Sequence, residues 1–518
     1  MIETFDIKIP IEEEASFTAS PALAAKQLRV NEGRIQGIRL IRRSIDARKK
    51  PIMLQLRFEV HLDQAIPEER PAFRMGDVSQ GEALHIIGAG PAGLFAALEA
   101  IHRGLKPIVF ERGKDVRARR RDLAKINKEQ IVNPESNYCF GEGGAGTYSD
   151  GKLYTRSKKR GDVNRILKGL VQFGADENIC VEAHPHIGTN KLPQIIVAMR
   201  EKIIACGGEV HFEKKLTDIH YEGDRIKSIE INSEERESVE HLILATGHSA
   251  RDIFELLQAK KIEIRAKPFA LGVRVEHAQS LIDRIQYKEE PRSELLPPAA
   301  YKIVKQVDGK GVYSFCMCPG GIIAPCATNP KEIVTNGWSP SRRNNPFANS
   351  GIVVSLEEED WKAYGKYGAL AAMHFQKDVE QKVFQAVNED SEIGQLAPAQ
   401  RLLDFVQGRD SKDLPKCSYQ PGVVPARLDL LLPKFIANRL RQAFQLFGKS
   451  MKGYLTNEAI VVAVESRTSS PVSIPRDREG MQHPQLKNLY PVGEGAGYAG
   501  GIVSAAIDGM KAVSAIKK

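Results

Sequence analysis

Glycines at one repeated spacing mark three stretches of the sequence as candidate phosphate-binding loops. The pattern G-x-G-x-x-G begins at Gly88 in "GAGPAG", at Gly141 in "GEGGAG" and at Gly495 in "GAGYAG". Such glycines allow a tight turn and a close approach of the backbone to a dinucleotide pyrophosphate. The chemistry also requires a strand that leads into the loop and a helix whose first amides face the anion. The flanking sequence must therefore decide between the three.

Only the first stretch has both flanking elements. "ALHII" before it is typical of a short buried strand, and "PAGLFAALEAIHRG" after it has apolar residues at helical spacing. The next apolar run, "KPIVFE", predicts a second strand that ends at Glu111, whose carboxylate can accept hydrogen bonds from both hydroxyls of a ribose. The alternative is an ordinary glycine-rich turn. The predicted dinucleotide contacts are Gly88, Gly90, Pro91, Ala92, Gly93 and Glu111.

The C-terminal glycine loop favours FAD over NAD as the dinucleotide. "NLYPV" predicts a strand that runs into Gly493 and Glu494, and a helix is expected to start after Gly501, at Ile502. The Glu494 carboxylate can hold a polyhydroxyl chain, and the start of a helix can stabilise the anionic edge of a reduced flavin. NAD needs no such second contact region. We therefore predict FAD as the cofactor, with these four residues among its contacts.

The length of 518 residues predicts several domains, because single hydrophobic cores rarely grow so large. Residues 1–80 carry short apolar runs without a glycine-rich loop, which indicates a small α+β module. Residues 81–265 hold the predicted βαβ unit and alternating runs typical of a β-meander. Residues 266–458 predict an inserted substrate or cap domain, and residues 459–518 return to complete the FAD-binding domain. The strands "LILATG" and "NLYPVG" are expected in one sheet.

Several stretches resemble a known flavoprotein group: "IIGAGPAGLFAAL", "NPESNYCFGEGGAGTYSDGKL", "LILATGHSARDIFELL", "KPFALGVRVEH" and "ESRTSSPVSIPRD". From about residue 80 the chain resembles the glutathione-reductase-like branch of the two-dinucleotide-fold flavoproteins, and more closely the bacterial uncharacterised FAD-utilising dehydrogenases. The resemblance implies an α/β fold, with a Rossmann-type FAD/NAD(P)-binding domain, a large inserted α+β domain and a small N-terminal α+β module. Where that superfamily usually has an aspartate in the C-terminal loop, this chain has Glu494. The resemblance also implies cofactor contacts from Arg112, Arg119, Leu216, Ala245, Thr246 and Gly247.

The middle glycine stretch lacks the context of a nucleotide fold, because it follows a basic helical segment and ends in polar "TYSDG". By resemblance, it lies along the one FAD. A glycine-rich surface turn is the alternative. The implied contacts are the backbone of Gly143, Gly144, Ala145, Gly146 and Thr147, with polar side chains from Thr147, Ser149 and Asp150.

Three of the seven cysteines, Cys316, Cys318 and Cys326, lie close together in the sequence. Cys316 and Cys318 would share one face of a strand and could meet a flavin. No C-x-x-C occurs and three cysteines lack the fourth ligand of a structural zinc site, so small buried core cysteines are favoured and no metal site is predicted. His184 and His186 could serve acid–base chemistry or simply form a turn.

Composition limits the partners. The net charge of +9 is mild for this length, and the basic stretch "RRSIDARKK" lacks interleaved aromatic residues, so nucleic-acid binding is not favoured. The start "MIETFDIKIPIEEE" has no apolar signal region, no run approaches 18 apolar residues, and the cysteines are odd in number. These features predict a cytoplasmic protein without a membrane partner.

Together these observations predict an FAD-dependent oxidoreductase, a dehydrogenase or reductase that acts on a small-molecule substrate by hydride transfer through flavin N5. A catalytic residue cannot be named from the sequence. The alternatives are a flavoprotein that modifies RNA and a non-catalytic FAD-binding module or sensor. Because no second strand, glycine loop and helix are complete, NAD(P)H is expected to dock transiently, or electrons come from the substrate or another protein.

Overall fold

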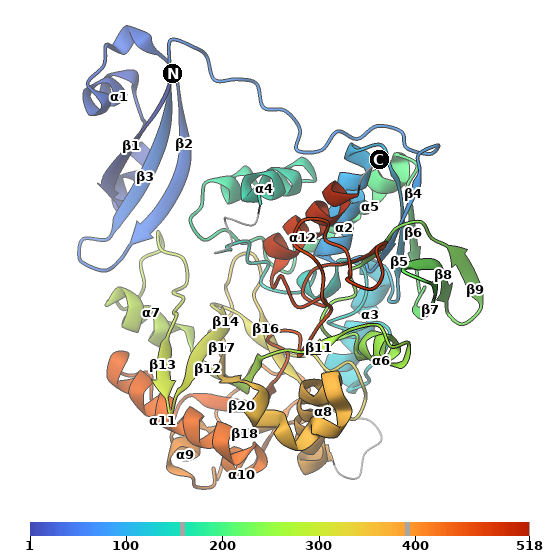
Figure 1. Ribbon diagram of the computed structural model, residues 1–518. Helices are drawn as coiled ribbons and strands as arrows, with labels where there is room; N and C mark the ends of the chain where they lie inside the picture. The colour runs from blue at the N-terminus through green and yellow to red at the C-terminus, as the bar shows by residue number, and fades with distance from the viewer. Residues whose placement is uncertain (156–160, 389–393, 517–518) are drawn as a thin grey trace.

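The computed structural model describes residues 1–155, 161–388 and 394–516. The chain begins with a small α+β module that stands to one side of the remaining chain and is joined to it by a long extended segment (Figure 1). Its three strands pair antiparallel in the order β1–β3–β2, and β3 supplies more of the buried core residues than any other element. The elements are β1 (Ile2–Pro10), α1 (Pro21–Leu28), β2 (Ile35–Asp46) and β3 (Met53–Leu62).

Strand β2 attaches the module to the main body through Arg43. The amide of Arg43 donates to the carbonyl oxygen of Val181 at 2.7 Å, and its own carbonyl accepts from the amide of Ala183 at 2.9 Å. The guanidinium pairs with Glu14 within the module and with Glu182 outside it. The module is therefore bound to the main body by these contacts of β2 as well as by its linker.

Five parallel strands form the sheet of the nucleotide-binding domain, in the order β22–β10–β4–β5–β6. Leu242 pairs with Leu489 and Leu244 with Pro491. The expectation that these two distant segments share one sheet is therefore confirmed, and the fold class is α/β as predicted. The strands are β4 (Ala83–Ile87), β5 (Lys106–Glu111), β6 (Glu209–Phe212), β10 (Leu242–Leu244) and β22 (Leu489–Pro491).

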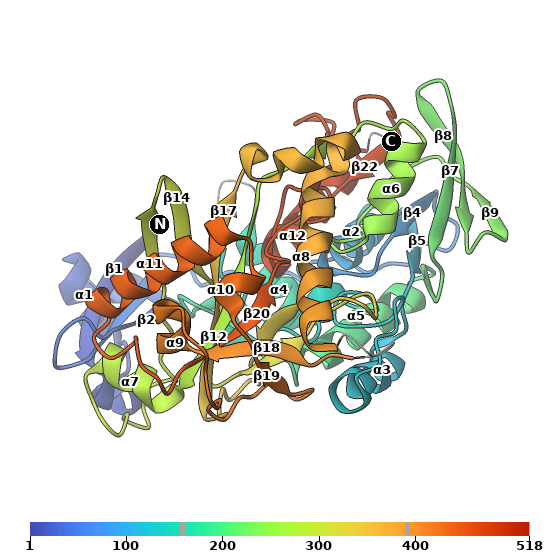
Figure 2. The same cartoon turned by 90° about the horizontal axis from the view of Figure 1, so that it is seen from below.

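Both faces of this sheet are covered, as its apolar strands require. Ile86 packs into the cluster formed with α2, α4, α5 and α12, whereas Ile87 packs on the opposite side with the meander β7–β9 and α6. Helices α2 and α12 lie side by side (Figures 1 and 2), so closely that a Cβ on Gly509 would be 2.0 Å from the carbonyl oxygen of Ala92. The elements are α2 (Pro91–His102), α3 (Val116–Glu129), α4 (Val163–Gln172), α5 (Leu192–Ala205), β7 (Leu216–Glu222), β8 (Arg225–Ile231), β9 (Glu235–Ser238), α6 (Arg251–Ala259) and α12 (Ile502–Ala515).

The inserted domain is built on a seven-stranded sheet in the order β13–β14–β17–β12–β20–β18–β19. Its strands are β12 (Phe269–Ala278), β13 (Val304–Val307), β14 (Lys310–Cys318), β17 (Phe347–Leu356), β18 (Ala397–Arg401), β19 (Val423–Pro425) and β20 (Ile460–Glu465). Its helices are α7 (Gln279–Tyr287), α8 (Ala371–Asn388), α9 (Leu402–Gln407), α10 (Leu428–Leu431) and α11 (Lys434–Ser450). Two small antiparallel sheets of two strands accompany it, β15 (Ile322–Pro325) with β16 (Thr335–Trp338) and β11 (Arg265–Ala266) with β21 (Val472–Ser473). In the described part of the chain, no helix combines the length and apolar character that crossing a bilayer would need.

The end of the inserted domain lies later than the sequence prediction placed it. Strand β20 pairs with β12 and β18, in the middle of the seven-stranded sheet, although residues 459–518 were assigned to the nucleotide-binding domain. "IVVAVE" is buried along its whole length, and such a run predicts a strand without showing which sheet it joins. The chain leaves the inserted sheet only after Glu465.

Candidate functional site

A cavity of about 290 Å³ lies where the parallel sheet meets the inserted domain. Strands β4, β5, β10 and β22 all end at it, which is the usual ligand position in an open parallel sheet. Most residues predicted to contact the cofactor line its wall, and their binding roles stay predictions. They are Gly88, Gly90, Pro91, Ala92, Glu111, Arg112, Gly144, Ala145, Gly146, Ser149, Asp150, Leu216, Ala245, Thr246, Gly247, Gly493, Glu494, Gly501 and Ile502.

The first glycine loop turns between β4 and α2 with no room for side chains. Gly88 has a φ of +104°, and a Cβ there would lie 2.5 Å from the carbonyl oxygen of Ala245. A Cβ on Gly93 would lie 1.8 Å from the carbonyl oxygen of Gly88, so Gly93 packs helix against strand behind the cavity. Gly90 caps α2, whose unpaired first amides lie at the cavity and can meet an anion.

The carboxylate of Glu111 joins three backbone segments at the cavity wall. One oxygen accepts from the amide of Ala89 at 2.9 Å, and the other accepts from the amides of Gly113 and Gly141, each at 2.9 Å. The side chain is buried, and a carboxylate has further acceptor capacity. Glu111 therefore fastens the first two glycine loops together in addition to its predicted contact with a ribose.

We expect Glu111→Gln to lower the free energy of unfolding by about 2–4 kcal/mol. The amide NH₂ of glutamine would face a backbone N–H, so at least one charge-assisted hydrogen bond is lost in a buried place. Chemical denaturation measures the change. Glu82→Gln, at an exposed position just before β4, is the matched control and should change stability by less than about 0.5 kcal/mol. Equal stability of the two variants would contradict the role of Glu111.

Four residues predicted to contact the cofactor do not line the cavity: Gly93, Arg119, Gly143 and Thr147. Arg119 is fully buried, and its guanidinium donates to the carbonyl oxygens of Asn137 and Glu142, each at 2.8 Å, and of Tyr138 at 3.0 Å. Its guanidinium holds the loop and does not line the cavity, and its predicted contact with a pyrophosphate stays a prediction. Basic character in the sequence did not reveal which arginine points inward.

Thr147 and Gly143 also lie behind the cavity wall, because their polar groups bind carbonyl oxygens of neighbouring loop residues. The Thr147 hydroxyl donates to the carbonyl oxygen of Glu142 at 2.7 Å, and the amide of Gly143 donates to the carbonyl oxygen of Ala89 at 2.8 Å. The fully buried Glu142, which the sequence did not single out, accepts from the amide of Val116 at the start of α3. Within the described segment 130–151 no strand leads into this stretch, as expected of a loop that is not a second nucleotide fold.

The C-terminal loop brings a carboxyl group to the cavity. The amide of Gly493, at a φ of +73°, donates to Asp508 at 2.7 Å, which fixes the turn. Burial raises the pKa of Glu494 to about 7, against the opposing effect of the Lys267 ammonium. Nε2 of His248 lies 4.0 Å from Glu494, and burial lowers the pKa of His248 to about 4. His248 and Lys267 were not predicted, since neither belongs to a recognisable spacing.

Across from the parallel sheet, the inserted domain supplies the opposite wall of the cavity. This wall consists of Phe315, Cys316, Cys318, Ala324, Cys326, Asn336, Gly337 and Trp338. All seven cysteines are free thiols. Cys318 and Cys326 are buried as expected, but Cys316 is exposed, because β14 bulges between Phe315 and Cys318.

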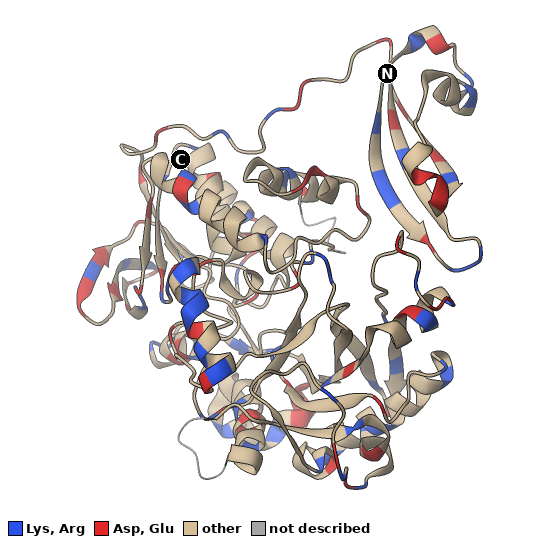
Figure 3. Cartoon of the chain, turned by 180° about the vertical axis from the view of Figure 1, so that it is seen from behind, with Lys and Arg blue, Asp and Glu red and all other residues tan. Residues whose placement is uncertain are grey.

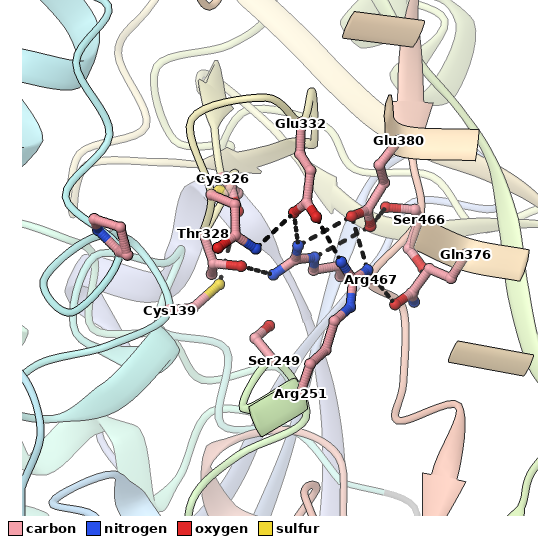
Figure 4. Close-up of polar contacts among 12 residues, drawn as sticks. Cys139, Ser249, Arg251, Cys326, Thr328, Glu332, Gln376, Glu380, Ser466 and Arg467 are labelled. Carbon is pink, nitrogen blue, oxygen red and sulfur yellow. Dashed lines mark hydrogen bonds and ion pairs between the residues drawn. The ribbon is translucent and has the colours of Figure 1, made fainter. Parts of the chain in front are cut away.

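Four charged side chains at the junction of the two domains are buried beside the cavity (Figure 4). Arg251 at the start of α6 pairs with Glu332 at 2.9 Å and with Glu380 of α8 at 2.8 Å. Arg467, which follows β20 and lines the cavity, pairs with the same carboxylates at 2.9 and 3.0 Å. Two arginines and two glutamates thus satisfy one another across the domain boundary.

The remaining candidates lie away from the cavity. His184 contacts the Tyr154 ring, and His186 Nε2 lies 3.1 Å from the carbonyl oxygen of Ser341. In the described residues, one group of side chains could hold a metal ion: Asp218, His220 and Glu230 on the meander. The ammonium of Lys260 already lies 2.7 Å from Asp218, which disfavours a cation there.

The wall of the cavity fits FAD in its donor and acceptor groups. The first amides of α2 can donate hydrogen bonds to a pyrophosphate, and Gly90 has no side chain that would keep the pyrophosphate away from the backbone. Glu111 offers an acceptor for ribose hydroxyls, while Glu494 and the start of α12 after Gly501 suit the ribityl chain and the flavin edge. The inserted domain faces these groups from the opposite wall of the cavity.

Comparison with known proteins places these features in a family. Residues 268–468 match the family described as "FAD-dependent protein, C-terminal domain-like", which ends after β20 and identifies FAD as the cofactor. Residues 1–61 match a domain of unknown function, DUF8436. Solved structures match the chain only at low identity and low TM-score. A geranylgeranyl bacteriochlorophyll reductase-like protein from Thermoplasma acidophilum is 12% identical, with 84% of this chain and 77% of that chain covered and a TM-score of 0.35. CtdE in complex with FAD is 11% identical, with 84% of each chain covered and a TM-score of 0.32.

One relative is much closer in sequence. An uncharacterized protein from Clostridium beijerinckii is 38% identical over 507 residues, which cover 94% of this chain and 93% of the relative. The similarity therefore includes the N-terminal module, the nucleotide-binding domain and the inserted domain. The chain belongs to the same family as this clostridial protein, and it carries the C-terminal domain of FAD-dependent proteins.

Proposed function

We propose that the protein is an FAD-dependent oxidoreductase that transfers a hydride between a small-molecule substrate and the flavin. Bound FAD supplies the redox chemistry, in which N5 of the ring accepts or donates the hydride. The observation that carries the proposal is a single cavity with two unlike walls. One wall is the carboxyl edge of the parallel sheet with its glycine loops, and the other is the inserted domain.

The chain's own groups have distinct tasks in this proposal. The glycine loops and Glu111 bind and orient the cofactor, and Phe315 and Trp338 form an apolar surface that excludes water from the substrate. The buried charged cluster around Arg467 keeps the inserted domain in place over the sheet. No residue is assigned as a proton donor to the substrate.

An anaerobic screen tests the proposal. The FAD-loaded protein is mixed with groups of metabolites, and absorbance near the flavin band is followed in the absence of oxygen. At least one small molecule should bleach the flavin faster than the no-substrate control. A comprehensive screen in which neither reduction by substrates nor reoxidation by acceptors occurs would contradict an oxidoreductase and favour a non-catalytic FAD module.

The alternative of an RNA-modifying flavoprotein gains little support from charge. Three of the five basic residues in "RRSIDARKK" form ion pairs: Arg43 with Glu14 and Glu182, Arg48 with Asp46, and Lys50 with Glu289. Basic and acidic residues are interspersed over the molecule, without one broad basic face in the view shown (Figure 3). A phosphate backbone would need unpaired cations.

NADH and NADPH are expected to bind weakly, with dissociation constants of about 0.1 mM or higher. In the described residues, one parallel sheet carries a strand, glycine loop and helix of the nucleotide-binding kind, and its cavity is assigned to FAD. Equilibrium dialysis in the dark, with the flavin oxidised, measures the binding. Tight binding of one equivalent of either nucleotide while FAD stays bound would contradict this expectation.

A further inference from the structure

Among the described residues that line the cavity, one cation lacks a close carboxylate of its own. Five lysines and arginines line the wall: Arg112, Lys152, Lys214, Lys215 and Arg467. Four of them form ion pairs of 3.0 Å or less, Arg112 and Lys215 with Glu135, Lys214 with Glu235 and Arg467 with Glu332. The Lys152 ammonium has only Asp150, at 3.9 Å.

Asp150 does not neutralise Lys152, because another cation is closer to it. The Arg343 guanidinium donates to the Asp150 carboxylate at 2.8 Å, and Asp150 is buried. His186 adds no negative charge, and burial lowers its pKa, which favours the neutral imidazole. The group of Lys152, Asp150 and Arg343 therefore has a net charge of +1 beside the cavity.

The ammonium of Lys152 is held in place by the bulged end of β14. It donates to the carbonyl oxygen of Met317, and it lies 4.0 Å from the sulfur of Cys318. The preceding carbonyl, that of Cys316, accepts from Arg274 at 3.3 Å. Cys316 has a φ of +41°, a conformation that L residues rarely adopt and that persists where the surroundings enforce it.

The buried pair beneath this bulge makes the arrangement rigid. Arg274 is fully buried and forms two hydrogen bonds with Glu465, at 2.7 and 2.9 Å. The backbone at the bulge is thus held by two cations: Arg274 binds the carbonyl oxygen of Cys316, and Lys152 binds that of Met317. The Lys152 side chain keeps 38% of its surface exposed, so its ammonium remains available to a ligand.

We propose that the inserted-domain end of the cavity binds the substrate as an organic carboxylate, with the Lys152 ammonium as the group that pairs with it. This inference rests on the proposed function and names the substrate class of the same site. The neighbouring wall supplies the aromatic rings of Tyr148, Phe315 and Trp338, which suit an apolar body next to the charged group. The net charge of +1 matches the single negative charge of a carboxylate, whereas a phosphate group carries about −1.5 to −2 at pH 7.

The test compares two probes of nearly equal shape, benzoate and benzamide, on the FAD-loaded protein. Isothermal calorimetry gives the dissociation constants, and the shift of the flavin absorbance reports binding next to the ring. Benzoate should bind at least about tenfold more tightly than benzamide, about 1.4 kcal/mol. Inorganic phosphate should bind more weakly than benzoate.

Variants separate the charge of Lys152 from its bulk. Lys152→Met should remove the preference for benzoate, and Lys152→Arg should retain most of it. Lys125→Met, at an exposed position of α3, removes the same charge elsewhere and should leave the preference unchanged. Thermal unfolding of each variant shows whether it is folded.

Three results would overturn the inference: equal binding of the two probes, no binding of benzoate, or an unchanged preference in Lys152→Met. A changed flavin potential with unchanged benzoate binding would also overturn it, since the ammonium would then act on the flavin. The flavin content of each preparation is measured first. Failure to hold FAD counts against the proposed function, whereas failure to bind benzoate by loaded protein counts against Lys152.

Discussion

Replacing Arg467 by methionine should lower the free energy of unfolding by about 3–5 kcal/mol, because it leaves buried carboxylates without one of their two cations. Glu380 and Glu332 are almost completely buried, and Arg467 supplies hydrogen bonds to both. Arg251 alone cannot neutralise two carboxylates. If Glu332 or Glu380 took up a proton, the repulsion between the two carboxylates would fall, but hydrogen bonds that the charged carboxylate accepts would be weakened.

Chemical denaturation of the Arg467→Met variant measures the loss. Arg284→Met is the matched control, because Arg284 forms a pair of similar length with Glu290, at 2.9 Å, while both side chains are more than half exposed. Exposed pairs contribute between about 0 and 1 kcal/mol, so the control should be nearly neutral. A loss below 1 kcal/mol for Arg467→Met would show that the cluster does not stabilise the domain boundary.

Gly90→Ala should weaken FAD binding by roughly tenfold or more while the protein stays folded. At Gly90 a new Cβ would meet nothing closer than Gly144 Cα at 3.8 Å, and its φ of −76° suits any residue. The cost to the protein is therefore less than about 1 kcal/mol, mainly from the change of helix cap. The added methyl group would instead occupy the place where the backbone must approach the pyrophosphate.

Flavin retention during dialysis and the dissociation constant of re-added FAD measure this effect. Gly365→Ala is the control, because a Cβ there meets nothing within 4 Å and Gly365 does not line the cavity. It should hold FAD as the unaltered protein does. If Gly90→Ala binds FAD equally well, the first glycine loop is not the pyrophosphate site.

Local sequence patterns predicted the part of the structure that local physics determines. The apolar run before Gly88 and the helical spacing after it correspond to β4 and α2. The paired strands around Leu242 and Leu489 were also foreseen, because a buried strand that runs into a glycine loop needs a neighbour in the same sheet. These features depend on a few adjacent residues.

What the sequence could not predict depends on contacts between distant segments. The inward direction of Arg119 follows from carbonyl groups of residues 137–142, and the placement of β20 follows from its pairing with β12 and β18. The wall formed by Trp338 and Lys152 appears only when the inserted domain folds back over the sheet. Trp338 belongs to no motif, and Lys152 follows the glycine stretch without being part of its spacing, so the glycine pattern could select neither.

The most direct test of the account is to identify the flavin in the purified protein. After reconstitution with FAD and removal of the excess, heat denaturation should release one FAD per chain, and chromatography should show no covalently attached flavin. The same procedure on Gly90→Ala should release clearly less. Release of FMN, or a protein that retains no flavin after reconstitution, would contradict the assignment of this cavity to FAD.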